Sequence, residues 1–249
     1  MKIFAVSDIH GFFKEFKSAL DDSGFQENNQ NHLLVCCGDY WDRGIQPLEV
    51  MNYLNSISNK ILVKGNHEDL LIEMLERGYP LQHDKHNGTY KTYEQLLDKY
   101  KVKQTVKDTC FSFINKMVDY YETKNYVFVH GWIPLKRTYI TDIEYTIKLN
   151  YYPEWRTGDW SEARWTNGIY YATEGQTIPD KTIVCGHWHC SEGHLYDALQ
   201  DKNCDWNNIS TAKNNYSPWY TKGCIAIDAC TVISHKVNII VLEDDLLEN

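Results

Sequence analysis

The sequence contains short apolar runs that each end in a cluster of polar residues, and this pattern constrains the fold most. Three such runs lie near the start of the chain, at residues 2–7, 32–37 and 60–64. Stretches with helical periodicity follow them, at residues 12–20, 47–54 and 68–77. Strands that alternate with helices predict βαβ units and a largely parallel sheet. Because ligands of such sheets bind beyond the carboxyl ends of the strands, the polar clusters mark the expected functional site.

Residues 82–124 differ in character from the strands and helices before them. They are charged and rich in tyrosine, and apolar side chains such as Tyr93, Leu96 and Tyr100 recur there at helical spacing. We therefore predict a helical insert. Because no repeat, low-complexity tract or linker interrupts the sequence, we expect the insert to belong to a single domain over residues 1–249.

Strand-like runs resume after the insert. They lie at residues 126–129, 182–185, 224–227 and 237–242. Residues 151–173 are rich in tryptophan, tyrosine and arginine, and we interpret them as a loop near the site. Residues 202–218 are rich in asparagine and serine, which favours an exposed loop.

The composition excludes several classes of function. The 249 residues carry 34 acidic against 25 basic side chains, which gives a formal net charge of −9. Such a surface disfavours nonspecific binding to nucleic acid or to an anionic membrane. No run approaches the roughly 18 apolar residues of a membrane-spanning helix. Since Met1 leads almost directly into a strand-like run, we expect neither a transmembrane helix nor a signal peptide.

The eight cysteines do not follow a metal-binding spacing. Cys36, Cys37 and Cys185 lie in apolar runs, where free cysteine behaves as a small hydrophobic side chain. No pair is spaced as C-x-x-C, so we expect no structural zinc site. Without an export signal, reduced thiols and a cytoplasmic location are the expectation.

Acidic, amide and imidazole side chains gather at the ends of five apolar runs. In chain order they are Asp8 and His10, Asp39 and Asp42, Asn66 and His67, His130, and His187 and His189. The spacing of Asp8 and His10 would place both on one face of an extended segment. Carboxylate oxygen with imidazole nitrogen suits manganese, iron or zinc. Carboxylates and imidazoles crowded at one rim would be costly without cations to neutralise and coordinate them.

Each cluster alone has a simpler structural explanation. His130 could be a hydrogen-bonded structural histidine, and Asp39 or Asp42 could cap a helix. Five separate strand ends would then each need an unrelated explanation. Taken together, they predict a metal centre at one rim of the sheet.

Two motifs carry a resemblance to a known family. The segments GDYWDRG at residues 38–44 and GNHE at residues 65–68 resemble the signatures of the calcineurin-like metallophosphoesterases. They are most similar to the phosphoprotein-phosphatase branch, which includes bacterial and phage Ser/Thr protein phosphatases and symmetrical diadenosine tetraphosphate hydrolases. The resemblance extends from residue 2 to about residue 243. It implies a four-layer α/β/β/α sandwich.

The resemblance also implies the ligands of two divalent metal ions, with manganese favoured over iron and zinc. Asp39 would bridge the two ions. The first ion would be held by Asp8 and His10, with His189 as a further ligand. The second ion would be held by Asn66, His130 and His187.

The same resemblance implies the catalytic groups. Arg43 would bind phosphate oxygens, since its planar fork suits two of them. His67 would be the general acid, oriented by Asp42. A second phosphate-binding arginine is expected near residues 160–168, where Arg164 is the candidate and Arg156, slightly upstream, the reserve. A hydroxide that bridges the metals would attack phosphorus, so the expected enzyme is a metal-dependent phosphoesterase.

The expected substrate is a phosphomonoester, as for a Ser/Thr protein phosphatase, because Asp42 and Glu68 match that branch. The partner would be a phosphorylated protein or peptide, or a small phosphoester, with no nucleic acid and no membrane. The alternative is a dinucleotide polyphosphate hydrolase, whose branch the segment at residues 186–188 resembles. Trp41, Trp132 and Trp188 could then form an aromatic wall for a base, or pack in the core. A non-catalytic scaffold should have lost a ligand, and this chain shows a complete set.

Overall fold

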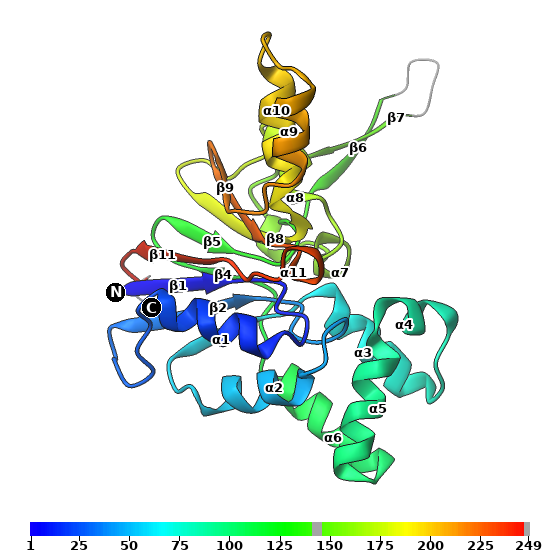
Figure 1. Cartoon of the computed structure of the whole chain (residues 1–249). Helices are drawn as coiled ribbons and strands as arrows, with labels where there is room; N and C mark the ends of the chain where they lie inside the picture. The colour runs from blue at the N-terminus through cyan, green and yellow to red at the C-terminus, as the bar shows by residue number, and fades with distance from the viewer. Residues whose placement is uncertain (141–145, 247–249) are drawn as a thin grey trace.

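Two β-sheets lie face to face, with helices on both outer sides (Figure 1). The computed structural model describes residues 1–140 and 146–246. The first sheet has the strand order β11-β1-β2-β3. Its strands are β1 (Lys2–Val6), β2 (His32–Cys37), β3 (Lys60–Val63) and β11 (Ile239–Glu243). The three N-terminal strands are parallel, as expected, and β11 runs antiparallel to β1 at the edge.

The second sheet has the order β4-β5-β8-β10-β9. Its strands are β4 (Tyr121–Glu122), β5 (Tyr126–Phe128), β8 (Thr182–His189), β9 (Trp219–Thr221) and β10 (Cys224–Asp228). The expected strands β5, β8 and β10 form its parallel centre. The short antiparallel strands β4 and β9, which the sequence pattern does not indicate, lie at the two edges.

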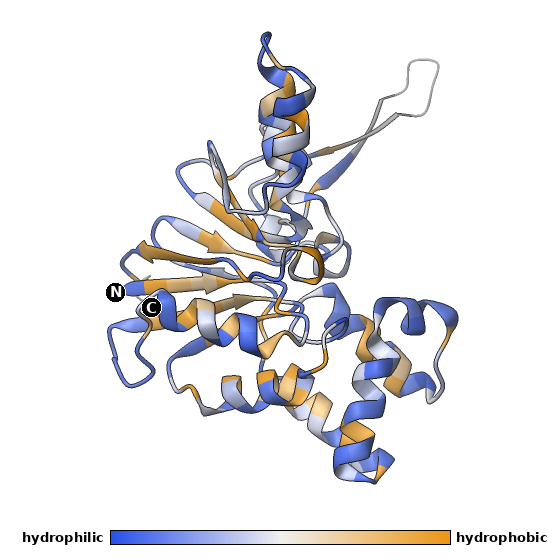
Figure 2. Ribbon diagram, in the orientation of Figure 1, coloured by the Kyte–Doolittle hydropathy of each residue, from blue (hydrophilic) through white to orange (hydrophobic). Residues whose placement is uncertain are grey.

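Successive side chains of β1 point to opposite faces of the first sheet, and this alternation explains the two apolar layers on either side of it. Ile3 and Ala5 point into the apolar layer between the two sheets, where Phe128 and Val184 of the second sheet also lie. Phe4 on the other face of β1 packs in a separate cluster with the helices. Since both faces of the central strands are buried, hydrophobic residues concentrate along them (Figure 2). The four-layer α/β/β/α sandwich is confirmed.

The outer helices of the first sheet follow its strands. They are α1 (Phe13–Asp22), α2 (Pro47–Ser56) and α3 (Asn66–Arg77). Pro47 begins α2, where the missing N–H costs nothing because no helical partner exists for it. Phe16 and Leu20 of α1 are fully buried against the sheet. These three helices start just beyond the strand ends, and α3 begins with two of the predicted site residues.

The predicted insert is helical. It consists of α4 (Gln82–Asn87), α5 (Thr89–Tyr100) and α6 (Lys103–Ile114). Leu96, Val106 and Phe113 are buried in the same cluster as the outer helices, so the insert packs onto the main core. Its helical part ends at Ile114 instead of residue 124, because the chain then leads into β4 of the second sheet, which begins at Tyr121.

Both segments interpreted as loops contain helices, so the loop interpretations are wrong. The first segment does lie near the predicted site, since Trp165 packs beside His187, and the second is mostly exposed, as expected. Residues 151–173 form η1 (Trp155–Thr157), α7 (Trp160–Ala163) and α8 (Gly168–Thr173). Residues 202–218 contain α10 (Trp206–Lys213), which pairs with α9 (Cys190–Gln200). Side chains of Asp159, Asn167 and Asp205 cap α7, α8 and α10. These helices are short and have few apolar residues at helical spacing, so caps, not periodicity, define them.

Other parts of the molecule project from the sandwich. The hairpin of β6 (Lys136–Ile140) and β7 (Thr146–Asn150) extends away from the second sheet, as does the α9–α10 pair (Figure 1). A four-residue helix, α11 (Thr231–Ser234), follows β10 beside the strand ends. Among residues 1–140 and 146–246, no helix is both long and apolar enough to cross a membrane.

Candidate metal centre

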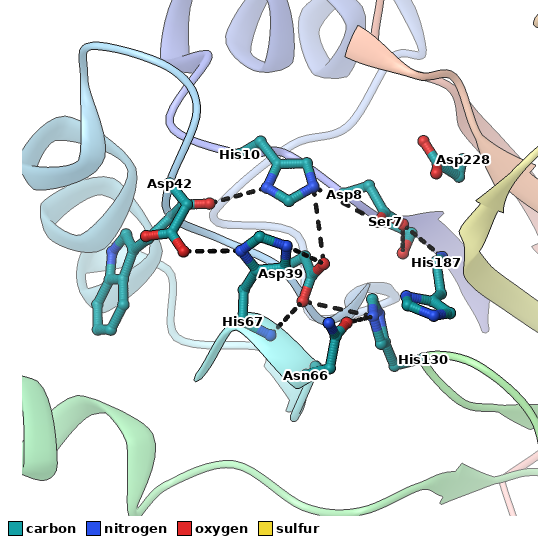
Figure 3. Close-up of polar contacts among 12 residues, drawn as sticks. Ser7, Asp8, His10, Asp39, Asp42, Asn66, His67, His130, His187 and Asp228 are labelled. Carbon is teal, nitrogen blue, oxygen red and sulfur yellow. Dashed lines mark hydrogen bonds and ion pairs between the residues drawn. The ribbon is translucent and has the colours of Figure 1, made fainter. Parts of the chain in front are cut away.

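The strand ends of both sheets deliver polar side chains to one cleft (Figure 3). Asp8 and His10 follow β1, Asp39 follows β2, and Asn66 and His67 begin α3. His130 follows β5, and β8 carries His187 near its end. The predicted residues that line the cleft are Asp8, His10, Asp39, Arg43, Asn66, His67, His187 and His189. Residues up to 181 positions apart in the sequence therefore meet at one place.

The backbone of the cleft adopts an unusual conformation. Of ten described residues other than glycine with positive φ, six are predicted site residues, with φ between 49° and 71°. They are Asp8, His10, Asp39, Asp42, Arg43 and His187. Such conformations cost of order 1–3 kcal/mol each and persist where the surrounding fold holds them, often at functional sites. Strain therefore concentrates where the sequence motifs place the chemistry.

Asp8 and His10 come together, but not as the sequence argument supposed. Strand β1 ends at Val6, so both residues lie beyond it in left-handed turns and not on one face of an extended segment. His10 Nε2 still lies 3.8 Å from Asp8 Oδ1. The turns make this approach possible, because each reverses the local direction of the chain.

Two glycines permit close contacts beneath the carboxylates. A Cβ atom on Gly65 would lie 2.2 Å from Asp39 Oδ1, and one on Gly186 would lie 2.2 Å from Asp8 Oδ2. Any larger residue would push the carboxylate out of place. These glycines set how closely β3 and β8 approach the two aspartates.

Asp39 lies at the centre of the cluster. Its Oδ2 is 3.6 Å from His10 Nε2, and its Oδ1 is 3.4 Å from His130 Nε2. Two groups of potential metal-binding atoms, each within 4.8 Å of one another, share this carboxylate: one includes His10 and His67, and the other His130 and His187. A carboxylate shared between two groups is suited to bridge two cations.

The histidine tautomers show that this cluster fits cations. His10 Nδ1 lies 2.9 Å from the carbonyl oxygen of Trp41, and His130 Nδ1 lies 2.8 Å from that of Cys37. Each Nδ1–H must donate to its carbonyl, so in the neutral ring the Nε2 lone pair faces Asp39. His130 Nε2 also lies 2.7 Å from Asn66 Oδ1. Lone pairs directed at carboxylate and amide oxygens repel unless a cation lies between them.

Burial supports neutral imidazoles as ligands. Burial lowers the pKa of His10 well below its usual value, and burial with the nearby His130 ring lowers the pKa of His187 to about 3. Burial raises the pKa of Asp8, whereas for Asp39 positive charge on neighbouring histidines, the protonated His67 among them, outweighs burial and holds the pKa low. Unprotonated imidazoles around an ionised central carboxylate form a donor set that fits transition metals.

Asp42 and His67 form a hydrogen-bonded pair beside the cluster. His67 Nδ1 lies 2.7 Å from Asp42 Oδ2, and both side chains are buried. Burial acts to lower the pKa of His67, but the charge of Asp39 and the bond to Asp42 outweigh it and raise the pKa to about 9. His67 Nε2 lies 3.8 Å from Asp39 Oδ2 and lines the cleft. The pair therefore presents a protonated ring to the cleft.

Arg43 and His189 lie at the more open side of the cleft. Arg43 is exposed and lines the cleft, where a phosphate oxygen could reach its guanidinium group. The His189 side chain is 36% exposed, and its Nε2 lies 4.0 Å from Asp228 Oδ2. Burial and the charge of Arg43 lower the pKa of His189, which favours the neutral ring.

Neither candidate for the second phosphate-binding arginine lines the cleft. Arg164 donates from Nε to Asp69 at 2.6 Å and from Nη1 to Asp119 at 2.8 Å. Arg156 forms an ion pair with Glu122. Phosphate binding by either arginine stays a prediction, and in this structure both guanidinium groups contact acidic side chains.

The structure assigns a positioning role to Glu68, which the sequence analysis used only as a branch marker. Its Oε2 accepts N–H bonds from Asp39 at 3.0 Å and Gly65 at 2.9 Å, and its Oε1 accepts one from Tyr40 at 3.0 Å. The carboxylate thus ties the end of β2 to the start of α3. Burial and the charge of Asp39 raise its pKa to about 7.

Asp228 and Trp165 are among the cleft residues that were not predicted. Asp228 is buried at the end of β10 and lines the cleft, so it repeats the pattern of a polar residue at a strand end. Trp165, 49% exposed, also lines the cleft.

Of the tryptophans proposed for an aromatic wall, Trp41 and Trp132 are buried in the core, so the wall is wrong for those two. Trp188 is 36% exposed beside the site.

Sequence relatives agree with this chemistry. A symmetrical bis(5'-nucleosyl)-tetraphosphatase of Buchnera aphidicola is 42% identical over 73 residues, which cover 29% of this chain and 26% of that protein. The enzyme of the same name from Coxiella burnetii is 26% identical over 132 residues, 53% of this chain and 42% of that protein. The chain therefore spans only about a quarter to two fifths of the length of these relatives.

A solved structure shares the fold. The cold-active protein-tyrosine phosphatase of a psychrophilic Shewanella species aligns over 97% of this chain and 75% of its own, with a TM-score of 0.57 and 14% identity. At that identity the likeness concerns the fold alone. The model of the calcineurin-like phosphoesterase family matches residues 1–206, which include every predicted metal ligand. The chain therefore belongs to the calcineurin-like phosphoesterase family and is a metal-dependent hydrolase.

Proposed function

We propose that the chain hydrolyses dinucleotide polyphosphates at a two-metal site, with a phosphomonoesterase activity as the second candidate. This reverses the order that the motifs alone favoured. The named activity of the sequence relatives supports the change. Since those relatives match over a minority of their length, the proposal depends on an observation in this chain.

That observation is Trp165 at the cleft. Its indole is about half exposed, lines the cleft and lies edge to face with His187 at a centroid distance of 5.9 Å. An exposed aromatic ring next to a phosphate-binding cleft can stack a nucleobase, at about 1–3 kcal/mol per base. A phosphoserine peptide offers no base to such a ring.

The residues of the cleft suit hydrolysis of a phosphoryl bond. Two bound metal ions, of which we favour manganese, would be held by the Asp39 cluster and would supply charge neutralisation and a water of lowered pKa. Arg43 would bind phosphoryl oxygens at the open side. His67 holds a proton at Nε2, directed into the cleft, and would deliver it to the departing oxygen.

A specific observation supports the second candidate. The hydrogen-bonded pair of Asp42 and His67 keeps an acid in the cleft, and an acid matters most for a poor leaving group such as a serine alkoxide. Hydrolysis of a dinucleotide breaks a phosphoanhydride bond and releases a nucleoside polyphosphate, which departs more readily than an alkoxide. The pair is therefore the feature that favours phosphomonoesters over dinucleotides.

The deciding experiment measures kcat/KM on diadenosine tetraphosphate and on a phosphoserine peptide with manganese-loaded protein. We expect the dinucleotide to be preferred. Trp165→Ala should raise KM for the dinucleotide about tenfold, roughly 1.4 kcal/mol, and leave KM for the peptide unchanged. Trp206→Ala, which removes an 83% exposed ring on α10, is the matched control. A tenfold preference for the peptide would restore the phosphomonoesterase as the main activity.

A further inference from the structure

The first turn of α5, in the helical insert, touches the Asp42–His67 pair. The hydroxyl of Thr89 donates to Asp42 Oδ2 at 2.6 Å, the same oxygen that His67 Nδ1 contacts. The hydroxyl oxygen of Thr92 accepts the backbone N–H of Asp42 at 3.0 Å. Both threonines are almost completely buried. Two side chains from the insert therefore contact one residue of the catalytic motif.

Gly88 lets the helix approach this closely. It precedes α5 with a φ of +90°, a conformation that other residues rarely adopt. A Cβ atom at this position would lie 2.5 Å from the backbone nitrogen of Arg43. Further along α5, Leu96 is fully buried in the main core. The close backbone contact at Gly88 and the buried side chain of Leu96 together fix how α5 lies against the loop of Asp42 and Arg43.

The orientation of the Asp42 carboxylate depends on these contacts. Within residues 1–140 and 146–246, Asp42 Oδ1 is buried and has no hydrogen-bond partner. Only Oδ2 is held, by Thr89 and His67. The χ2 torsion of an aspartate is broad, so a carboxylate with hydrogen bonds to only one oxygen rotates easily. The two bonds to Asp42 Oδ2 together limit this rotation. Loss of the Thr89 hydroxyl would therefore loosen the group that orients the His67 ring.

We propose that the helical insert takes part in the reaction through Thr89 and Thr92, as positioning residues for Asp42 and thereby for His67. The proposal rests on the general-acid role of His67 in the proposed function. Thr89 sets the direction of the carboxylate, and Thr92 sets the backbone from which it extends. The insert, which the sequence marks only by helical periodicity, thus completes the support of the acid.

The test compares Thr89→Val, which keeps the shape and removes the hydroxyl, with Thr89→Ser, which keeps the hydroxyl. Turnover is measured on an alkyl phosphate and on nitrophenyl phosphate, whose leaving group needs no proton, with metal content and melting temperature recorded. We expect Thr89→Val to lose about tenfold in kcat on the alkyl ester and clearly less on the nitrophenyl ester. Thr89→Ser, which keeps the hydroxyl, should retain most of the wild-type kcat on the alkyl ester.

Two controls keep the outcome decisive. Thr105→Val replaces an exposed threonine of α6 in the same insert and should change neither rate. If Thr89→Val does not fold, Thr92→Val removes the second contact and should show the same selectivity more weakly. Equal losses on both esters in the threonine variants, with His67→Asn selective for the alkyl ester, would overturn the positioning role alone. Equal losses in His67→Asn as well would overturn the general acid and the positioning role with it.

Discussion

The two walls of the cleft differ in how firmly their side chains are held. On the wall around Asp39, the groups are tied to backbone: His10 and His130 each donate to a carbonyl, and Glu68 accepts three backbone N–H groups. On the other wall, which includes Trp165 between α7 and α8 and has Trp188 of β8 beside it, side chains are partly exposed. Trp165 is 49% and Trp188 36% exposed.

This difference separates two tasks. A hydrogen bond to a backbone group fixes the direction of a metal-binding side chain. The wall around Asp39 can therefore hold cations in one geometry. The exposed wall has fewer constraints and more free surface, which suits recognition of the part of the substrate beyond the phosphate. Substitutions on the first wall should therefore affect every substrate, and those on the second should affect substrates unequally.

The largest effect should follow from Asp39→Asn. Asp39 faces both groups of metal-binding atoms, so its neutral replacement weakens both sites at once. We expect loss of metal and a fall in turnover of ~10³-fold or more on every substrate, since metal ions supply several kcal/mol of barrier lowering. Elemental analysis checks the metal content. A full metal complement with unchanged turnover would refute the bridging role of Asp39.

The next effect, from His67→Asn, should depend on the leaving group. General-acid help is worth ~10²–10⁴ in rate, and it matters for an alkoxide but not for nitrophenolate. We expect metal content to stay intact and the loss to fall on the alkyl ester. Asp42→Asn should show the same pattern more weakly, because the ring remains. Similar losses on both esters would make phosphate binding the better role for His67.

The pH profile provides an independent check on His67. Its pKa is raised to about 9, and an acid donates only below its pKa. Activity on the alkyl ester should therefore hold at neutral pH and fall as pH rises through that region. Bound cations repel the proton and would move this fall toward lower pH. The fall should be absent in His67→Asn and on nitrophenyl phosphate.

An intermediate effect is expected for Glu68→Gln. The amide of glutamine can accept through one oxygen only, so at least one of the three backbone N–H groups would face an NH₂ group. An unpaired buried donor costs about 1–3 kcal/mol, and positioning groups of this kind alter metal affinity about 10–100-fold. Thermal unfolding and metal titration measure both. Glu76→Gln, at an exposed position of the same helix, should have neither effect.

The sequence predicted the wall around Asp39, here called the firm wall, better than the exposed wall around Trp165. Strands β1, β2 and β3 are apolar runs followed within three residues by Asp8, Asp39 and Asn66, so the sequence pattern and the topology together place these residues at one rim. The resemblance of the motifs to the family indicated the roles of these residues, but it did not indicate the hydrogen bonds that orient their side chains. The firm wall was predictable because its residues follow buried strands directly.

The residues that the sequence did not reveal depend on contacts between distant segments. Glu68 acts on Asp39, 29 positions earlier, and Thr89 acts on Asp42, 47 positions earlier. Trp41 looked available for a base, yet it packs against Phe113 of the insert with ring centroids 5.2 Å apart. Trp165 lies between two short capped helices that periodicity does not detect. Tertiary packing decides each of these cases.

The smallest effect should come from His189→Ala, and it tests where the firm wall ends. His189 matches a metal-binding position of the family, but its side chain is 36% exposed and its Nε2 lies 4.0 Å from Asp228. A ligand with an exposed ring and few fixed contacts adds less than a buried, oriented one. We therefore expect about a tenfold weaker affinity for one metal ion and near-normal turnover when metal is saturating.

Metal titration followed by kinetics at saturating manganese separates these two quantities. His86→Ala, which removes an exposed imidazole from α4, controls for adventitious metal binding by histidine. Loss of one whole metal ion, or a fall in turnover as large as that of Asp39→Asn, would show that His189 belongs with the firm wall. In that case the boundary between the two tasks would lie beyond β8, and Asp228, the last residue of the neighbouring strand β10, would become the next residue to test.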